Sequence, residues 1–265
     1  MKRHPVAISV ILAAVMIILW FRHSPKINDW MIIWNLDAIA PVELLIEKFE
    51  LTVFRNDNEI KGYVVDGLIN KWKDPIGVRL RDKEIKRFEG HVKNTLDILS
   101  RLSGLDIHLH DGVKGKRKLL DIYIAPPNRL ETILQFYDVK KSLIDMSDDA
   151  ICLSVSIIVR GGSERAVVII LDTLSDERIK HCIIEELTQT LGLDADTDIL
   201  QPSIMSDTIP LIDRLPMNDK IMVRTLYDQR LKSGMNRDEV MPIVRKIIPE
   251  LVAAVKERGE EALYQ

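Results

Sequence analysis

The sequence has few aromatic residues, only two cysteines and no excess of basic charge. Its formal net charge is −3, and no basic stripe interleaved with aromatic residues is found, so nucleic acid is not expected as a partner. No cysteine precedes Cys152, which excludes lipid attachment near the N-terminus. No internal repeat or low-complexity tract is present. Hydrophobic residues make up 46% and charged residues 29%, the balance of a globular protein.

The scarce tryptophans are concentrated near the N-terminus, at Trp20, Trp30 and Trp34. Residues 5–21 carry no charge, and basic residues flank them on both sides. A membrane-spanning helix needs about 17–25 apolar residues, so this stretch lies at the short end of that range. Basic flanks that reach the interfaces can make up the missing length. We therefore expect a single N-terminal transmembrane anchor over residues 1–23.

Two alternatives for this segment stay open, a cleaved signal peptide and a buried core helix. A signal peptide ends in small residues, whereas here Ala13 and Ala14 lie inside the run and Trp20, Phe21 and Arg22 follow it. The short basic start favours a cytoplasmic N-terminus. The expected location is thus the inner membrane, with a single span and a periplasmic C-terminal domain.

Residues 24–50 are apolar but are interrupted by acidic residues and by Pro41, so a second span is not expected. We expect an apolar juxtamembrane segment that lies at the interface or docks onto the domain. The alternative is that it forms the first core element of the domain itself. The globular domain is expected over residues 51–265.

The rest of the chain shows hydrophobic patterns of both strands and helices. Strands are expected at residues 76–80, 105–110, 119–125, 151–160 and 166–172, and a Gly-Gly-Ser turn should join the last two as a hairpin. Helices are expected at residues 83–103, at about 176–191, and from Asn236 onward. Pro242 and Pro249 should kink the last helix. This order predicts an α+β fold with a mixed sheet followed by a helical C-terminal part.

The two cysteines lie at the start of the predicted hairpin, at Cys152, and in the following helix, at Cys182. If the domain is exported, an even cysteine count at this separation predicts one disulfide. Two buried thiols are the alternative for a cytoplasmic domain. Neither cysteine has a nearby pattern of His or Asn that would indicate a nucleophile.

The helix at 176–191 carries a pattern close to that of zincin peptidases, His-Glu-x-x-His. In that pattern the two histidines, four residues apart, hold zinc, and the Glu activates the attacking water. Here Glu185 and Gln189 stand at the two ligand positions, Glu186 at the position of the base, and Gly192 at that of the glycine that often follows. A Gln amide is a poor zinc ligand, so the standard zinc site is missing.

The motif continues beyond this helix. It comprises Cys182, Glu185-Glu186-Leu187, Gln189 and Leu191-Gly192-Leu193, followed by residues 202–207, 226–228 and 234–235. In this order the segments resemble the bacterial family called domain of unknown function 2927, over roughly residues 62–250. Members of that family look like exported, zincin-like envelope proteins. The resemblance implies a zincin-like fold with Glu186 as the catalytic candidate and a cleft formed by Glu185, Gln189, Gly192, Ser203 and Asp207.

No cofactor is expected, with zinc as the alternative. The weak metal candidates are His181 and Glu185, which lie four residues apart and so share a helix face. His108 and His110 alternate on a predicted strand and form another pair. For these histidines the alternative is a solvated surface. Apolar residues surround Glu185 and Glu186, so at least one of the two carboxylates should be partly buried.

A run of alternating acidic residues follows the helix at Asp194, Asp196 and Asp198. A calcium loop would need Gly at the sixth position and Glu at the twelfth, which are Ile199 and Met205 here. A polar loop is therefore expected at this place.

The expected function is a membrane-anchored binding or scaffolding component of the cell envelope that is not an enzyme. Its partner would be an envelope protein or peptidoglycan. The alternative is a peptidase or hydrolase that uses Glu186 as general base with atypical metal ligands. A purely structural role is a third interpretation.

Overall fold

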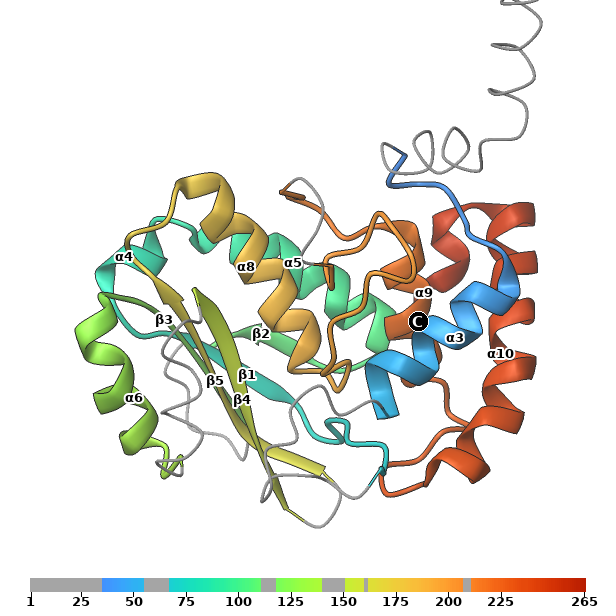
Figure 1. Cartoon of the computed structure of the whole chain (residues 1–265), viewed down its shortest axis with the longest axis horizontal. Coiled ribbons are helices and arrows are strands. Elements are labelled where there is room, and N and C mark those ends of the chain that lie inside the picture. The colour runs from blue at the N-terminus through green and yellow to red at the C-terminus, as the bar shows by residue number, and fades with distance from the viewer. Residues whose placement is uncertain (1–34, 55–66, 111–117, 140–150, 160–161, 207–210) are drawn as a thin grey trace, which may run out of the picture.

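The computed structural model describes residues 35–54, 67–110, 118–139, 151–159, 162–206 and 211–265. The anchor expected at residues 1–23 lies outside these ranges. Within them, no helix combines the length and the apolar character that crossing a bilayer requires. A β-sheet and its covering helices make up one side of the molecule, and a group of helices makes up the other (Figure 1).

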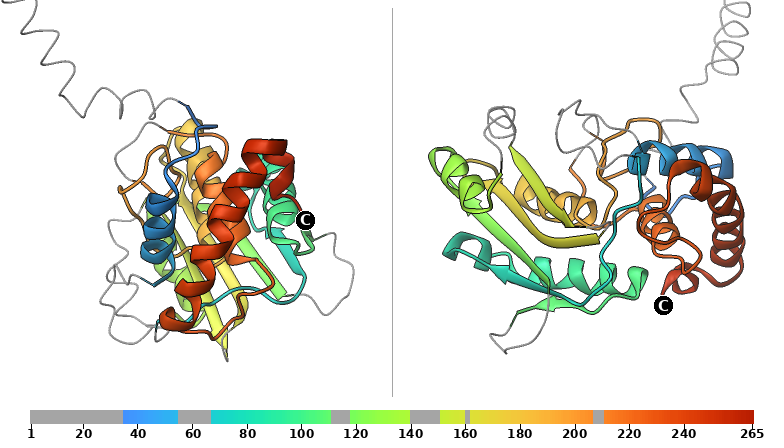
Figure 2. Two further views of the ribbon diagram at one scale, coloured as in Figure 1. Left: turned by 90° about the vertical axis from the view of Figure 1, so that its right-hand side faces the viewer. Right: turned by 90° about the horizontal axis from the view of Figure 1, so that it is seen from below.

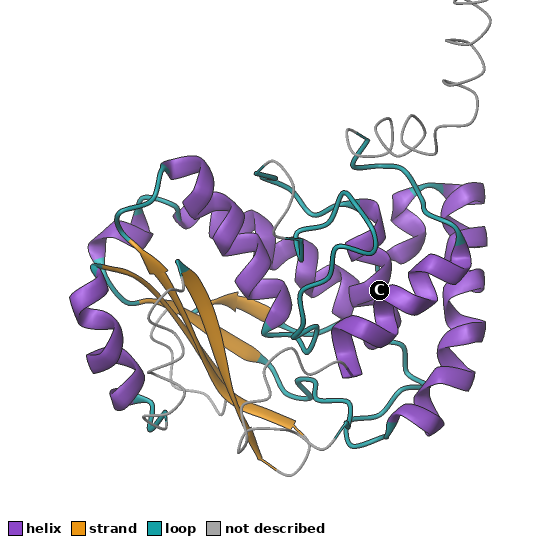
Figure 3. Cartoon of the chain, in the orientation of Figure 1, coloured by secondary structure: helices purple, strands orange, loops and turns teal. Residues whose placement is uncertain are grey.

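The sheet is mixed and has five strands (Figure 3). They are β1 (Ile76–Leu80), β2 (Ile107–Leu109), β3 (Lys118–Ala125), β4 (Cys152–Val159) and β5 (Gly162–Leu171). Their spatial order is β2-β1-β3-β5-β4. The neighbours among β2, β1, β3 and β5 pair in parallel, and β4 pairs with β5 in antiparallel. The expected hairpin is therefore confirmed, and it places β4 at an edge of the sheet.

Alternate side chains of the central strands point to opposite faces of the sheet and enter two separate cores. Ile122 and Ile124 of β3 belong to the larger core, which includes α5 (Glu89–Ser103) and α8 (Asp176–Gln189). Tyr123 and Ala125 belong to a smaller core covered by α6 (Leu130–Phe136), which follows the short 3-10 helix Pro127–Arg129. The sheet thus lies between helices on both faces (Figure 2).

The single helix expected at residues 83–103 is instead two helices, α4 (Lys83–Lys86) and α5. Asp82 caps the start of α4, and its two carboxylate oxygens accept hydrogen bonds from different elements. Oδ1 accepts from the backbone N of Ile85 in α4, and Oδ2 accepts from the backbone N of Ile124 in β3, both at 2.9 Å. This anchors α4 to the sheet in its own orientation. Strand 105–110 is likewise shorter than expected and ends as β2 at Leu109.

The C-terminal part is helical, as expected. It contains α9 (Met217–Leu226), α10 (Arg237–Arg258) and the short 3-10 helix Glu260–Leu263. Asn236 and Glu239 form the expected capping box at the start of α10, and the helix continues through Pro242 and Pro249.

An N-terminal helix, α3 (Val42–Phe54), belongs to this helical part and packs against α9 and α10 (Figure 1). It crosses residue 50, after which the globular domain was expected to begin. Leu45 and Phe49 are fully buried in the larger core. Helix α3 thus contributes buried side chains to the core of the domain, which was the alternative for the apolar segment.

A buried ion pair connects α3 to α9. Lys48 Nζ lies 2.6 Å from Asp219 Oδ1, and both side chains are fully buried. Lys48 also donates to the hydroxyl of Ser203, which donates in turn to Asp219 at 3.0 Å. The second oxygen of Asp219 accepts from the backbone N of Ile204 at 2.8 Å. Each buried charge therefore has an opposite charge and further hydrogen bonds, without which burial would be costly.

Candidate functional site

The predicted helix at 176–191 is α8, which begins and ends at clear sequence signals. The Ser175 hydroxyl caps it by accepting from the backbone N of Arg178 at 3.3 Å. Asp176 and Glu177 in the first turn complement the helix dipole. The helix ends at Gln189, three residues before Gly192.

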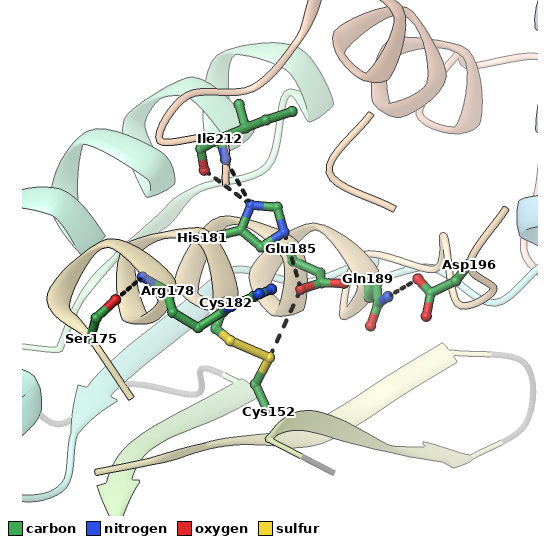
Figure 4. Close-up of a disulfide and its surroundings, with 9 residues drawn as sticks. All are labelled: Cys152, Ser175, Arg178, His181, Cys182, Glu185, Gln189, Asp196 and Ile212. Carbon is green, nitrogen blue, oxygen red and sulfur yellow. Dashed lines mark hydrogen bonds and ion pairs between the residues drawn. A yellow bond between two sulfur atoms is a disulfide. The ribbon is translucent and has the colours of Figure 1, made fainter. Parts of the chain in front are cut away.

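A disulfide joins α8 to the edge of the sheet, as the two-cysteine pattern predicted. Cys182 of α8 is bonded to Cys152 at the start of β4, with a Cα–Cα distance of 6.0 Å (Figure 4). The bond closes a sequence separation of 30 residues. A loop of this length corresponds to a stabilisation of about 3–4 kcal/mol through the restricted unfolded chain.

Glu185 lies beside this disulfide and faces His181 (Figure 4). Its Oε2 is 3.7 Å from His181 Nε2 and 3.9 Å from Cys152 Sγ. The predicted sharing of a helix face by His181 and Glu185 is thus confirmed. The solvated surface considered for His181 is wrong, because its side chain is buried and its Nδ1 lies 3.1 Å from both the N and the O of Ile212.

Glu186 points into the protein rather than to solvent. It is 4% exposed, and its Oε2 has no hydrogen-bond partner in the described part of the chain. Burial raises the pKa of the Glu186 carboxyl to about 8, while a hydrogen bond from Ser154 of β4 opposes this shift and the charge of Asp196 adds to it. The expected burial of at least one acidic side chain is confirmed. At pH 7 this carboxyl is mainly neutral and is enclosed by other side chains.

Gln189, at the second ligand position, is engaged by the loop that follows the helix. Its Nε2 donates to Asp196 Oδ1 at 2.7 Å (Figure 4). In the same loop, Ser206 donates to Asp198 at 2.5 Å. The acidic residues after the helix thus form a hydrogen-bonded polar loop, as expected.

Gly192 has a packing role at the end of α8. Its φ is +107°, and a Cβ built at this position would lie 2.0 Å from the backbone O of Asn70. The segment that contains Asn70 is held at the same place by a hydrogen bond, since Trp72 donates from Nε1 to the O of Thr190 at 2.7 Å. Gly192 is therefore required because two backbones approach closely, and it does not face an open cleft.

The expected cleft also included Ser203 and Asp207. Ser203 is fully buried against Lys48 and Asp219, so it does not line a cleft open to solvent. Asp207 lies outside the described residues. The sequence did not reveal the ion pair around Ser203 because its charged partners are remote from it along the chain.

The other histidine pair is not part of this site. His108 lies on β2, at the opposite edge of the sheet from β4, and His110 directly follows that strand. His108 Nδ1 is 2.8 Å from Asp106 Oδ1. Because α8 packs against β4 and β5, the fold keeps these two histidines apart from Glu185 and Glu186.

Within the described ranges, one group of side chains has the donor atoms of a metal site. Cys152 Sγ, Cys182 Sγ and a carboxylate oxygen of Glu185 all lie within 4.8 Å of one another. Sulfur binds metals as a thiolate, and here the two sulfurs are bonded to each other. In the disulfide form this group therefore cannot act as a thiolate site.

A hollow of about 220 Å³ lies between α5, α8 and residues 211–215. Its lining is formed by His91, Asn94, Thr95, Ile98, Leu99, Ile184, Asp213, Arg214 and Leu215. Sequence reasoning missed this hollow because three remote segments form it and none of them carries a recognisable motif.

The fold and the site define a mixed α/β protein in which a helix bearing a buried acid is tied by a disulfide to the edge strand of a mixed sheet. Residues 43–246 match the family described as "Protein of unknown function (DUF2927)". The chain belongs to this family, as its motifs indicated. No curated protein and no solved structure matches it.

Replacing Gly192 with Ala should destabilise the protein strongly. The added Cβ would meet the O of Asn70 at 2.0 Å, so the two backbones must separate. We expect a loss of roughly 3 kcal/mol or more in the free energy of unfolding, measured by urea denaturation. Gly234→Ala is the matched control, since Gly234 has a φ of +89° and nothing within 4 Å of the added atom. Equal losses in both variants would contradict the close approach.

Glu186→Gln should change the pH dependence of stability. The folded-state pKa of Glu186 is raised from 4.5 to about 8, so the folded state holds this proton more tightly than the unfolded state does. The contribution of Glu186 to the free energy of unfolding is then greatest below pH 4.5, falls as pH rises from 4.5 to 8, and is lost above that. The slope is at most about 1.4 kcal/mol per pH unit.

The measurement is urea unfolding of wild type and Glu186→Gln from pH 4.5 to 9. The wild type should lose stability relative to the variant across pH 4.5–8. Glu177→Gln, in the exposed first turn of the same helix, retains Glu186 and should lose stability across this range as the wild type does. Parallel profiles for wild type and Glu186→Gln would show that the carboxyl is not held neutral.

Proposed function

We propose that the protein is a zincin-like, non-catalytic binding or scaffolding component of a cell envelope, held by one N-terminal membrane helix. The observation that supports this proposal most strongly is the enclosure of Glu186, the residue at the position of the peptidase base. It is 4% exposed, and burial holds its pKa at about 8. A base that activates water must be ionised and within reach of that water.

The two positions that hold zinc in a zincin are also unfavourable for the metal. Gln189 bears an amide that donates to Asp196 at 2.7 Å. Glu185 bears a carboxylate that faces His181 at 3.7 Å and lies beside a sulfur of the disulfide. With one weak ligand and no thiolate, the oxidised protein offers fewer good ligands than the three protein ligands of a catalytic zinc.

The zincin-like part of the proposal is supported by the placement of the motif. The degenerate motif lies on a helix that packs against the β4–β5 hairpin of a mixed sheet, and a helical part follows it in the chain. The hollow beside α8 supports the binding role, because it combines apolar residues with His91, Asp213 and Arg214. Its occupant would be a segment of an envelope protein or a portion of peptidoglycan.

The proposal predicts that the purified, oxidised full-length chain does not hydrolyse an unfolded protein substrate supplied with zinc. Glu186→Gln should give the same background, because the carboxyl does not reach a substrate. The measurement is release of labelled peptides, with a zinc peptidase as the positive control. Zinc-dependent hydrolysis that is lost in Glu186→Gln while the fold is retained would favour the peptidase alternative.

The membrane topology can be tested separately. A reporter enzyme that is active only in the periplasm, fused after Gln265, should be active in a bacterial host. The apolar run at 5–21 and its basic start favour this orientation. The same fusion with residues 1–23 deleted is the control and should be inactive. An inactive full-length fusion and an active cytoplasmic reporter would reverse the topology.

A further inference from the structure

We propose that reduction of the Cys152–Cys182 disulfide converts its surroundings into a binding site for zinc or a similar divalent transition metal. The ligands would be the two cysteine thiolates, the carboxylate of Glu185 and the Nε2 of His181. The proposed function concerns the oxidised chain, so this inference goes beyond it and does not depend on it.

The donor atoms are already close to the required arrangement. The two sulfurs and a Glu185 oxygen lie within 4.8 Å of one another, and His181 Nε2 lies 3.7 Å from Glu185 Oε2. Zinc bonds of about 2.0–2.3 Å in a tetrahedron place the donor atoms about 3.5 Å apart. The sulfurs must therefore separate once their bond is broken. The Glu185 carboxylate already lies near both sulfurs, whereas His181 is outside this group of three, so its imidazole must move towards the sulfurs.

The scaffold holds these side chains from two directions (Figure 4). His181, Cys182 and Glu185 project from successive turns of α8. Cys152 comes from β4, whose position is set by antiparallel pairing with β5, where Cys152 lies opposite Ile170. A site shared by a helix and a strand of the same core needs little reorganisation when a metal ion binds.

The environment of His181 suits a metal ligand. Its Nδ1 lies 3.1 Å from both the backbone N and the carbonyl O of Ile212, and the N–H of Ile212 donates to it. Binding of a metal through Nε2 therefore requires the ring proton to move to Nδ1, where the carbonyl O of Ile212 can accept it. A backbone carbonyl that accepts from the second ring nitrogen is the usual orienting partner of a zinc-bound histidine.

The chemistry requires a dithiol reductant. It supplies two electrons and two protons, the S–S bond breaks, the protein gains two thiols, and the reductant becomes a disulfide. Zinc then displaces the two thiol protons and binds both thiolates. Thiolate and imidazole ligands select zinc over magnesium or calcium. Oxidation forms the S–S bond again and removes two of the four ligands, so disulfide and bound metal exclude each other.

The experiment uses the full-length chain in a mild detergent and cobalt(II) as a spectroscopic substitute for zinc. We expect the oxidised chain to bind no cobalt at this site. The chain reduced with a dithiol, which is then removed under anaerobic conditions, should bind one equivalent with a thiolate-to-cobalt charge-transfer band. Zinc should displace the cobalt, and magnesium should not.

Substitution of each proposed ligand should show how much that ligand contributes to the affinity for cobalt. Cys152→Ser and Cys182→Ser should each weaken the charge-transfer band and lower the affinity more than 100-fold. Glu185→Gln and His181→Ala should lower the affinity by at least about 10–100-fold, the range for the loss of an outer-shell partner. Glu177→Gln, on the same helix but outside the cluster, should bind like the wild type.

Circular dichroism in the same samples covers the case in which reduction loosens the fold. A reduced chain that unfolds and is restored by one equivalent of zinc supports the proposal. A reduced chain that binds no cobalt, whether it is folded or unfolded, overturns it. Equal binding by the oxidised and reduced chains, or a charge-transfer band that persists when both cysteines are replaced, would overturn it as well.

Discussion

The ion pair of Lys48 and Asp219 is the constraint on which the rest of the structure depends. Both charges are fully buried, so neither can leave the other without a large desolvation cost. The pair joins α3 to α9, and Ser203 and the backbone of Ile204 complete its hydrogen bonds. The loop that follows α8 is therefore fixed to the helical part. A residue that looked like a cleft hydroxyl in the sequence thus has a structural role.

The fixed loop in turn restricts the movement of α8. The C-terminal end of the helix is held by the close approach of Gly192 to Asn70 and by the hydrogen bond from Trp72. The middle of the helix is held by the disulfide to β4. A helix restrained at both places cannot rotate to expose Glu186, so the burial of this carboxyl follows from the architecture around it. The raised pKa is then a consequence of packing, not evidence by itself of a catalytic role.

Sequence reasoning succeeded where the signal is local. The strand at 76–80, the capping box at Asn236, the helix that carries Glu185 and Glu186, and the hairpin before it all follow from periodicity and turn residues. The disulfide followed from the cysteine count and the expectation of export. The break between α4 and α5 was missed because Ile85 and Phe88 continue one apolar stripe in the sequence. The hydrogen bond that Asp82 accepts from the backbone of β3, which ties α4 to the sheet, comes from a residue remote in the chain. The burial of His181 and the partners of Ser203 were missed for a similar reason, since residues remote in the chain supply them.

The two proposals concern two redox states of the same part of the molecule, the surroundings of the Cys152–Cys182 disulfide. In the oxidised chain the sulfurs are bonded to each other and Gln189 donates to Asp196. Among the described residues around the disulfide, His181 and Glu185 then supply the imidazole and carboxylate donors. Two ligands from one helix face bind zinc weakly, so a scaffold without metal is the expected state in an oxidising compartment. Reduction adds two thiolates beside Glu185, whereas Glu186 stays enclosed and accepts a hydrogen bond from Ser154 of β4. A metal bound there would be held by four protein ligands and would have no open position for water. It would therefore stabilise the fold as a structural ion and would not restore hydrolysis.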